Sequence, residues 1–215
     1  IGSQDMNDEV WFKLARRINE LAAMPDVAGI VITHGTDTIE ETGYFLNLVV
    51  KSKKPVVLTA AMRPSTALSA DGPLNFFNAV AVAANKNSAG RGVLVVVNDW
   101  IHGASSLTKT STTAVQTFLS PVWGLIGTVA YGEIEFFRGP VGRNTTDSEF
   151  SLDGVAALPR VDIIMAHENM DGALIDAAVA AGAKGLVIAG VGNGNMTKAA
   201  LDALAAQAKK GVVCV

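Results

Sequence analysis

The sequence contains one cysteine, three histidines and only 17% charged residues among its 215 positions. The single cysteine, Cys214, excludes an intrachain disulfide and a cysteine-based metal site, and three scattered histidines argue against zinc. No apolar run approaches the roughly 20 residues that span a bilayer, so we do not expect an integral membrane protein. The net charge is −3 and no block of Lys and Arg stands out, so nucleic acid is not an expected partner.

The sequence does contain a regular alternation of apolar strand patterns and helical patterns. Continuous apolar runs, typical of strands buried on both faces of a parallel sheet, occupy residues 29–33, 55–59 and 92–97. This alternation predicts an α/β fold with a mostly parallel, doubly wound sheet. Helices are predicted around Trp11, Leu14, Ala15, Ile18 and Leu21 with Asn7 or Asp8 as cap, over Glu40–Val50, and over Pro73–Asn85.

A second block of alternating elements follows residue 160. Its strands are predicted at 161–165, 185–189 and 211–215, and its Ala-rich helices end at glycines. The loop-forming composition between Arg138 and Arg160 indicates a linker. We therefore expect an N-terminal domain over residues 1–140, a linker over 141–160 and the start of a second, incomplete domain over 161–215. Both ends of the chain are expected to be incomplete.

The strongest local feature is Thr33–Thr42, which follows the first predicted strand and opens a helix. Open α/β sheets bind ligands at this edge, and a helix N-terminus offers free N–H groups to an anion or a developing oxyanion. A simple helix cap is the alternative, since Asp37 with Glu40, or Thr38 with Glu41, has capping-box spacing. Three hydroxyls, a carboxylate and a histidine within six residues exceed what a cap requires. This excess favours a functional site.

This segment resembles the second signature of the asparaginase/glutaminase family in its bacterial type II form. The resemblance runs in order along almost the whole chain, and six motifs in one order are far more specific than a lone Gly-Asn-Gly-Asn. In the family, a Thr-Gly-Gly-Thr-Ile signature comes earlier and carries a mobile lid and the threonine usually assigned as the nucleophile. The N-terminal domain is therefore expected to lack its first strand and lid here. The five further motifs are Ser3–Asp8, Ala60–Ser65, Ser69–Pro73, Thr108–Thr110 and Ala189–Asn195.

The resemblance implies that Thr36, Asp37 and Lys109 are catalytic residues. A threonine hydroxyl is a weak nucleophile until a base takes its proton, and a partly buried lysine can be that base. Asp37 can orient the lysine, and in the family it also binds the α-amino group of the substrate. We expect the Lys109 ammonium within about 2.6–3.2 Å of the Thr36 hydroxyl. Without the resemblance, a solvated loop lysine would be the better interpretation of Lys109.

Four other residues match substrate-binding positions of the family. Ser3 and Gln4 match residues that hold the substrate α-carboxylate, and the backbone of Ala61 matches the group near the scissile amide. Asn195 matches a residue that reaches into the active site of a neighbouring subunit. The resemblance therefore implies a symmetric homo-oligomer, a tetramer built from dimers.

Several polar residues have simpler structural interpretations. Asp71 is interpreted as the cap of the helix that Pro73 opens. His34 is expected to fix its turn, and His102 and His167 are interpreted as incidental to function.

The resemblance implies an amidohydrolase that converts L-asparagine, with L-glutamine as a second substrate, through a threonyl acyl-enzyme. No metal or organic cofactor is implied, and the type II resemblance implies a periplasmic location, with the cytoplasm as the alternative. Two other functions stay open. One is the amidase subunit of a tRNA-dependent amidotransferase, and the other is a non-catalytic small-molecule binding protein. A hydroxyl paired with a lysine favours the enzyme, because binding alone does not require that pair.

Overall fold

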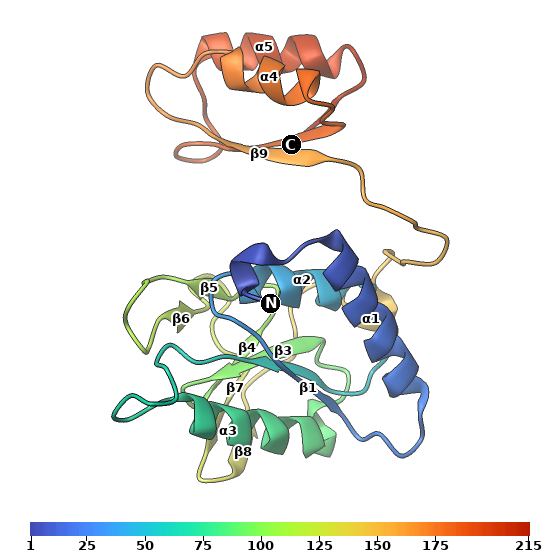
Figure 1. The fold of residues 1–215 in the computed structure, drawn as a ribbon, viewed down its shortest axis with the longest axis vertical. Coiled ribbons are helices and arrows are strands. Elements are labelled where there is room, and N and C mark those ends of the chain that lie inside the picture. The colour runs from blue at the N-terminus through green and yellow to red at the C-terminus, as the bar shows by residue number, and fades with distance from the viewer. The chain divides into compact units, whose positions relative to one another are not determined.

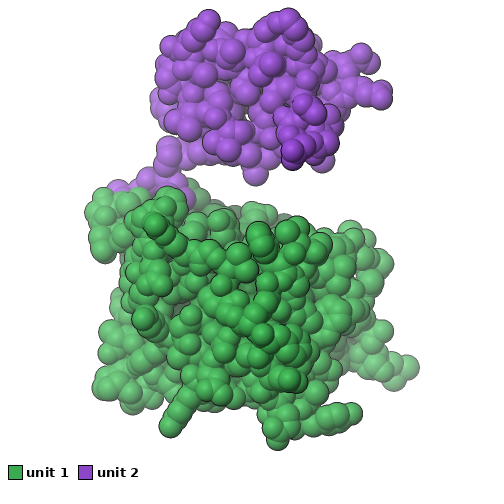
Figure 2. Space-filling model, turned by 180° about the vertical axis from the view of Figure 1, so that it is seen from behind, with its two compact units in different colours: residues 1–155 green, residues 156–215 purple.

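The computed structural model describes all residues from 1 to 215, which form two compact units, Ile1–Val155 and Ala156–Val215 (Figure 2). We call them unit 1 and unit 2. No helix of either unit combines the length and apolar character needed to cross a lipid bilayer.

Unit 1 is built on a six-stranded sheet with the strand order β1-β2-β3-β4-β7-β8. The first three strands are parallel, and the other three are added antiparallel. The predicted α/β class is confirmed, whereas the antiparallel strands were not predicted. The strands span Ile30–Thr33 (β1), Val56–Thr59 (β2), Val93–Val97 (β3), Trp100–Gly103 (β4), Gly127–Ala130 (β7) and Glu133–Phe136 (β8).

Three helices, Asp8–Ala23 (α1), Ile39–Val49 (α2) and Gly72–Ala84 (α3), cover both faces of this sheet (Figure 1). One face packs its side chains, Val56 and Leu58 of β2 among them, into a core with α1 and α2. On the opposite face, Val57 belongs to a second core with α3. Because strand side chains alternate between faces, the two cores lie on either side of β2. The sheet is therefore doubly wound.

The connections β1-α2-β2 and β2-α3-β3 have opposite hands. Both join parallel strands that are neighbours in the sheet and follow in chain order. Both step in the same direction across the sheet, yet α2 and α3 lie on opposite faces. One of the two connections is therefore left-handed, although about 98% of such crossovers are right-handed. The loops of these same two connections carry residues of the candidate site.

Helix α1 is capped, as predicted, by Asn7, whose side chain accepts a hydrogen bond from Val10 N at 3.1 Å. Its buried face differs from the predicted one, because Phe12 and Ala22 are also buried. The indole N–H of Trp11 donates to Thr42 on α2 at 2.9 Å, which holds this ring at the edge of the helix interface. The predicted face residues that are only partly buried are Trp11, Leu14 and Leu21.

The smaller elements of unit 1 complete its surface. Thr108–Lys109 (β5) and Phe118–Leu119 (β6) form an antiparallel hairpin. Three short 3₁₀ turns lie at Ser3–Asp5 (η1), Lys86–Ser88 (η2) and Thr145–Asp147 (η3).

Part of the segment predicted as a linker packs onto unit 1. Thr145 and Ser148 are buried, and the Lys51 ammonium donates to their carbonyl oxygens at 3.2 and 2.8 Å. The boundary between the two units falls after Val155.

Unit 2 is a three-stranded parallel sheet with the order β11-β10-β9 and two helices on one face (Figure 1). Ile164 and Leu186 on the covered face are buried, whereas Ile163 and Met165 on the other face are exposed. Gly182 and Gly211 follow the ends of the two helices, as predicted, both with positive φ. The elements span Val161–Met165 (β9), Ala173–Ala180 (α4), Gly185–Ala189 (β10), Lys198–Ala208 (α5) and Val213–Cys214 (β11).

His102 on β4 is a fully buried titratable group of unit 1. Its Nδ1 lies 2.9 Å from Ser120 Oγ, and its Nε2 has no hydrogen-bond partner. Protonation would place a charge and a second, unpartnered N–H in the core, so burial lowers the pKa of His102 from 6.5 to about 4.

The depressed pKa of His102 predicts a loss of stability in acid. His102 binds a proton less readily in the folded protein than in the unfolded chain. Its contribution to the free energy of unfolding is therefore present above pH 6.5 and is lost as the pH falls toward 4. The loss should amount to roughly 3 kcal/mol of unfolding free energy. Urea unfolding of the wild type and His102→Gln at pH 7 and pH 4.5 measures it. The wild type should lose more stability than the variant, and equal losses would contradict the prediction.

Candidate active site

The loop between β1 and α2 places Thr36 and Asp37 at the carboxyl edge of the parallel strands. β1 ends at Thr33, and α2 begins at Ile39. The N–H of His34 donates to the carbonyl of Thr59, the last residue of β2, at 2.9 Å. Since β1 and β2 are parallel, the loops that follow both strands lie at the edge where open α/β sheets bind ligands.

Lys109 reaches this loop from the β5–β6 hairpin. Its ammonium donates to Thr36 Oγ1 at 2.9 Å and to Asp37 Oδ1 at 2.6 Å. The Thr36 hydroxyl in turn lies 3.5 Å from Asp37 Oδ1. The predicted distance between the Lys109 ammonium and the Thr36 hydroxyl is confirmed. The Lys109 ammonium therefore meets the Asp37 carboxylate and the Thr36 hydroxyl, although Lys109 lies 72 and 73 positions from these two residues in sequence.

The ion pair of this cluster is asymmetric in exposure. The Lys109 side chain is 14% exposed, whereas that of Asp37 is 61% exposed. The hydrogen bond from Lys109, and then the charge of its ammonium, lower the pKa of Asp37 below its ordinary value of 3.8. The carboxylate is thus held ionised, with its free surface available to a cationic group of a ligand.

The capping-box interpretation of this segment is wrong. Thr38 is the N-cap residue of α2, but its side chain makes no cap hydrogen bond. Its hydroxyl donates instead to the carbonyl of Ser3 at 2.7 Å. Glu40 Oε2 accepts from the backbone N–H of Lys109 at 3.1 Å. The polar side chains of the segment therefore hold distant parts of the chain in place and do not cap their own helix.

Glu40 is the site residue that the sequence prediction missed. Its position in the first turn of α2 suggested only a cap, and its partner is 69 positions away. No local pattern could reveal that contact. Glu40, Asp37 and Lys109, with Thr110, Ser111 and Thr112 of the loop after β5, line a cavity of about 480 Å³.

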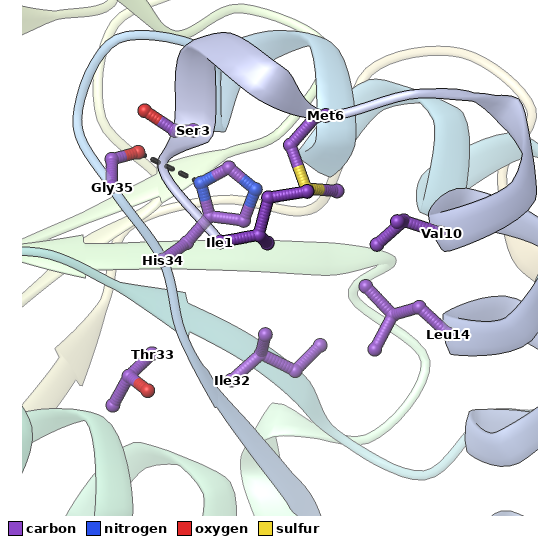
Figure 3. A pocket seen from close by; sticks show the side chains of 9 residues that line it. All are labelled: Ile1, Ser3, Met6, Val10, Leu14, Ile32, Thr33, His34 and Gly35. Carbon is purple, nitrogen blue, oxygen red and sulfur yellow. Dashed lines mark hydrogen bonds between the residues drawn. The ribbon is translucent and has the colours of Figure 1, made fainter.

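Ser3 bonds to the site loop, whereas Gln4 makes no hydrogen bond to it. Ser3 is buried, joined to the loop through the Thr38 hydroxyl, and lines an adjoining, mainly apolar cavity of about 380 Å³ (Figure 3). Gln4 is exposed, and its amide bonds to Asp5 at 3.1 Å. The same cavity contains His34, whose Nδ1 lies 2.7 Å from Gly35 O (Figure 3). That contact agrees with the predicted role of His34 in its turn.

Ala61 follows β2 at the same edge, on a loop that Asp71 holds in place. Asp71 accepts from the backbone N–H groups of Met62 and Arg63 at 2.8 and 2.9 Å, and it makes no cap hydrogen bond to α3. The interpretation of Asp71 as a simple cap is therefore wrong. Its carboxylate fixes the two residues that follow Ala61, and Ala61 makes no hydrogen bond to the Thr36–Asp37–Lys109 cluster.

Asn195 belongs to unit 2, where it is exposed on the loop after β10. Its backbone forms a two-residue bridge with Val191, with N–O distances of 2.8 and 2.9 Å. A tight loop therefore presents this side chain to the surroundings. The structure contains no cluster of three or more His, Cys, Asp or Glu side chains arranged to hold a metal ion.

A parallel α/β sheet with a hydroxyl, an ammonium and a carboxylate at its carboxyl edge is typical of enzymes that activate a hydroxyl nucleophile. Residues 1–142 match the family model "Asparaginase, N-terminal", and residues 160–215 match "Glutaminase/Asparaginase C-terminal domain". The chain belongs to the asparaginase family.

Individual relatives match the chain over nearly its whole length. It is 54% identical to "Probable L-asparaginase periplasmic" of Haemophilus influenzae and 51% identical to "L-asparaginase 2" of Bacillus subtilis, each over 100% of the chain. It is 46% identical over 99% of its length to "Glutaminase-asparaginase" of Pseudomonas fluorescens. The chain spans 61%, 57% and 58% of the length of these three relatives.

The contact between Glu40 and Lys109 yields a prediction about the local stability of β5. Glu40→Ala removes the acceptor of the Lys109 backbone N–H, a bond to a charged group worth about 1.5–3 kcal/mol. Hydrogen exchange at this amide, followed by NMR, should then be at least about tenfold faster. Glu40→Gln retains an acceptor oxygen at the same place and should exchange nearly as slowly as the wild type. Unchanged exchange in Glu40→Ala would rule out the contact.

Proposed function

We propose that the full-length protein is an amidohydrolase that converts L-asparagine to L-aspartate and ammonia through a threonyl acyl-enzyme. The observation that carries the proposal is the contact of the Lys109 ammonium with Thr36 Oγ1 at 2.9 Å and Asp37 Oδ1 at 2.6 Å. Membership of the asparaginase family and the names of the relatives support the same reaction.

In the proposed reaction, Asp37 and Lys109 control the proton of the Thr36 hydroxyl. The resting pair is an ammonium and a carboxylate, because the pKa of Asp37 is lowered. A substrate α-ammonium can pair with the exposed carboxylate of Asp37. This carboxylate is then the counterion of both the substrate ammonium and the Lys109 ammonium. Repulsion between the two cations then favours release of a proton from Lys109 to solvent. The amine so formed accepts the Thr36 proton, and Thr36 in turn takes the proton of the attacking hydroxyl, that of the threonine in the family's earlier signature, as this hydroxyl attacks the side-chain amide carbonyl.

The remaining steps follow from the charge that develops on the amide. Attack places a negative charge on the carbonyl oxygen, which backbone N–H groups stabilise. The Lys109 ammonium returns its proton to the departing nitrogen, so ammonia leaves and a threonyl ester remains. Water then hydrolyses the ester to aspartate and restores the hydroxyl.

Asparagine is the proposed substrate, and glutamine is a second one. The two amides differ by one methylene, a difference that a pocket discriminates by only about 1–3 kcal/mol. The names of the relatives include both "L-asparaginase 2" and "Glutaminase-asparaginase". Both substrates therefore belong in the assay.

Two further properties belong to the proposal. The protein is a homo-oligomer, a tetramer built from dimers, in which the exposed Asn195 completes the site of a neighbouring subunit. The protein is located in the periplasm, in line with the name of the Haemophilus influenzae relative, "Probable L-asparaginase periplasmic".

Substitution of Lys109 by methionine tests the proposed proton relay. Lys109→Met keeps an unbranched chain of similar length, so packing should change little. The turnover number kcat for ammonia release by the full-length enzyme should fall by about 10²–10⁴-fold. Thr36→Val should be similarly severe. The double variant should be scarcely worse than either single one, because residues that act as one unit have non-additive effects.

Ammonia release is measured for asparagine and glutamine, and thermal melts confirm that each variant folds. Losses that multiply in the double variant would show that Thr36 and Lys109 act separately, which would refute the relay. A folded, full-length wild type that binds asparagine without releasing ammonia would refute the proposed activity and indicate a binding protein.

A further inference from the structure

The start of α3 holds the loop that contains Ala61 at three points. Asn75 donates to the carbonyl of Ala60 at 2.9 Å. Asp71 accepts from the two backbone N–H groups that follow Ala61, at 2.8 and 2.9 Å. The third point is Gly72, which has no side chain, and a Cβ there would lie only 3.2 Å from that of Ala61. The residues on both sides of Ala61 are therefore tied to α3.

Asn75 also connects this loop to the turn between β3 and β4. Its side-chain oxygen accepts from the backbone N–H of Asn98, the first residue after β3, at 2.8 Å. Asn75 is 2% exposed, and its amide nitrogen also lies 3.4 Å from Asp71 Oδ2. Both N–H groups and the oxygen of this buried amide thus have partners, which fixes its position. Asn75 therefore holds the loop after β2 against the turn after β3.

Asn98 continues this connection to the hairpin that contains Lys109. Its side-chain amide donates to the carbonyl of Val115, in the loop between β5 and β6, at 2.5 Å. That loop is closed by Thr110, whose backbone N–H and hydroxyl both donate to the carbonyl of Thr117, at 2.9 and 2.8 Å. The hairpin lies outside the main sheet, so its position depends on side-chain contacts of this kind.

The backbone of Asn98 is suited to this contact. Its φ is 50°, in the left-handed region that asparagine adopts more readily than most residues other than glycine. Glycine would fit the turn equally well, but it has no amide to donate to Val115. The asparagine therefore satisfies both the turn and the contact with the hairpin.

We propose that Asn75 and Asn98 are positioning residues that hold the Ala61 loop in register with the Lys109 hairpin. The inference rests on the proposed function, in which Lys109 relays the proton and Ala61 lies near the scissile amide. A substrate amide beside one loop must meet the proton relay on the other, and a misplacement of about 1 Å can lower a rate by about 10²-fold. Neither asparagine bonds to Lys109, so each acts through the loop that it holds.

Asn75→Ala and Asn98→Gly, each made in the full-length enzyme, test the inference. Asn75→Ala removes the bonds to both loops, whereas Asn98→Gly removes only the amide that holds Val115 and keeps a residue suited to positive φ. In each variant kcat for ammonia release should fall by about 10–100-fold. KM should change little, because Asp37, which pairs with the substrate α-ammonium in the proposed reaction, is not altered.

Asn78→Ala is the matched control. Asn78 is a second buried asparagine of α3, 1% exposed, and its side chain donates to that of Asp99 at 2.8 Å. Its removal should lower the melting temperature without breaking the connection between the Ala61 loop and the hairpin. At temperatures where the protein stays folded, kcat should therefore remain at the wild-type level. A loss of kcat as large as that of Asn75→Ala would indicate general destabilisation and would overturn the inference.

Hydrogen exchange at the Thr110 and Ser111 amides, followed by NMR, gives a readout that does not depend on activity. Both amides donate to Thr117 within the hairpin, at 2.9 and 2.7 Å. Exchange should be about two- to tenfold faster in Asn75→Ala and Asn98→Gly, as the loss of one ordinary hydrogen bond predicts, and unchanged in the control variant. Folded variants with wild-type kcat and unchanged exchange would overturn the inference.

The two readouts separate this inference from the proposed function. A full-length wild type that releases no ammonia would overturn the proposed function, and faster exchange in the two variants would still support the connection between the loops. An active wild type whose folded Asn98→Gly variant keeps the wild-type kcat would overturn this inference alone. Asn98→Gly also decides the case if Asn75→Ala fails to fold, because glycine fits the backbone at that position.

Discussion

The contact of Lys109 with Thr36 and Asp37 is the interaction on which the rest of the site depends. It joins a two-residue strand, β5, to the loop that follows β1, across more than seventy positions of sequence. β5 belongs to a small hairpin outside the main sheet, so little other structure fixes the lysine. The ion pair and the Glu40 acceptor together determine where the ammonium lies.

The main sheet and its loops provide the fixed side of this contact. Parallel strands β1 and β2 end at the same edge, and side-chain hydrogen bonds hold the loops after them. Thr38 binds the carbonyl of Ser3, and Asp71 binds the backbone of Met62 and Arg63. The opposite hands of the two crossovers place α2 and α3 on different faces, with both N-termini at this edge. Each of the two loops is thus held by its own set of hydrogen bonds.

The sequence predicted the parallel half of the fold better than its antiparallel half. The strands β1, β2 and β3 are continuous apolar runs, and burial on both faces explains that pattern in β2 and β3. β7 includes Gly127 and Thr128, and β8 alternates between glutamate and apolar residues, so they lack such a run. The motifs identified Thr36, Asp37 and Lys109 through resemblance to a family. Glu40 and Asp71 were interpreted as caps, because the spacing of residues along a helix contains no information about partners that lie outside that helix.

The pKa of the Asp37 carboxyl, measured by NMR titration of its side-chain carbon in the wild type and in Lys109→Met, tests the central contact most directly. The account predicts a wild-type pKa below the ordinary value of 3.8, because Lys109 donates a hydrogen bond and a positive charge to the carboxylate. In Lys109→Met the pKa should return toward that ordinary value. An Asp37 pKa that is the same in both proteins would show that Lys109 does not engage Asp37 in solution, and would contradict the account.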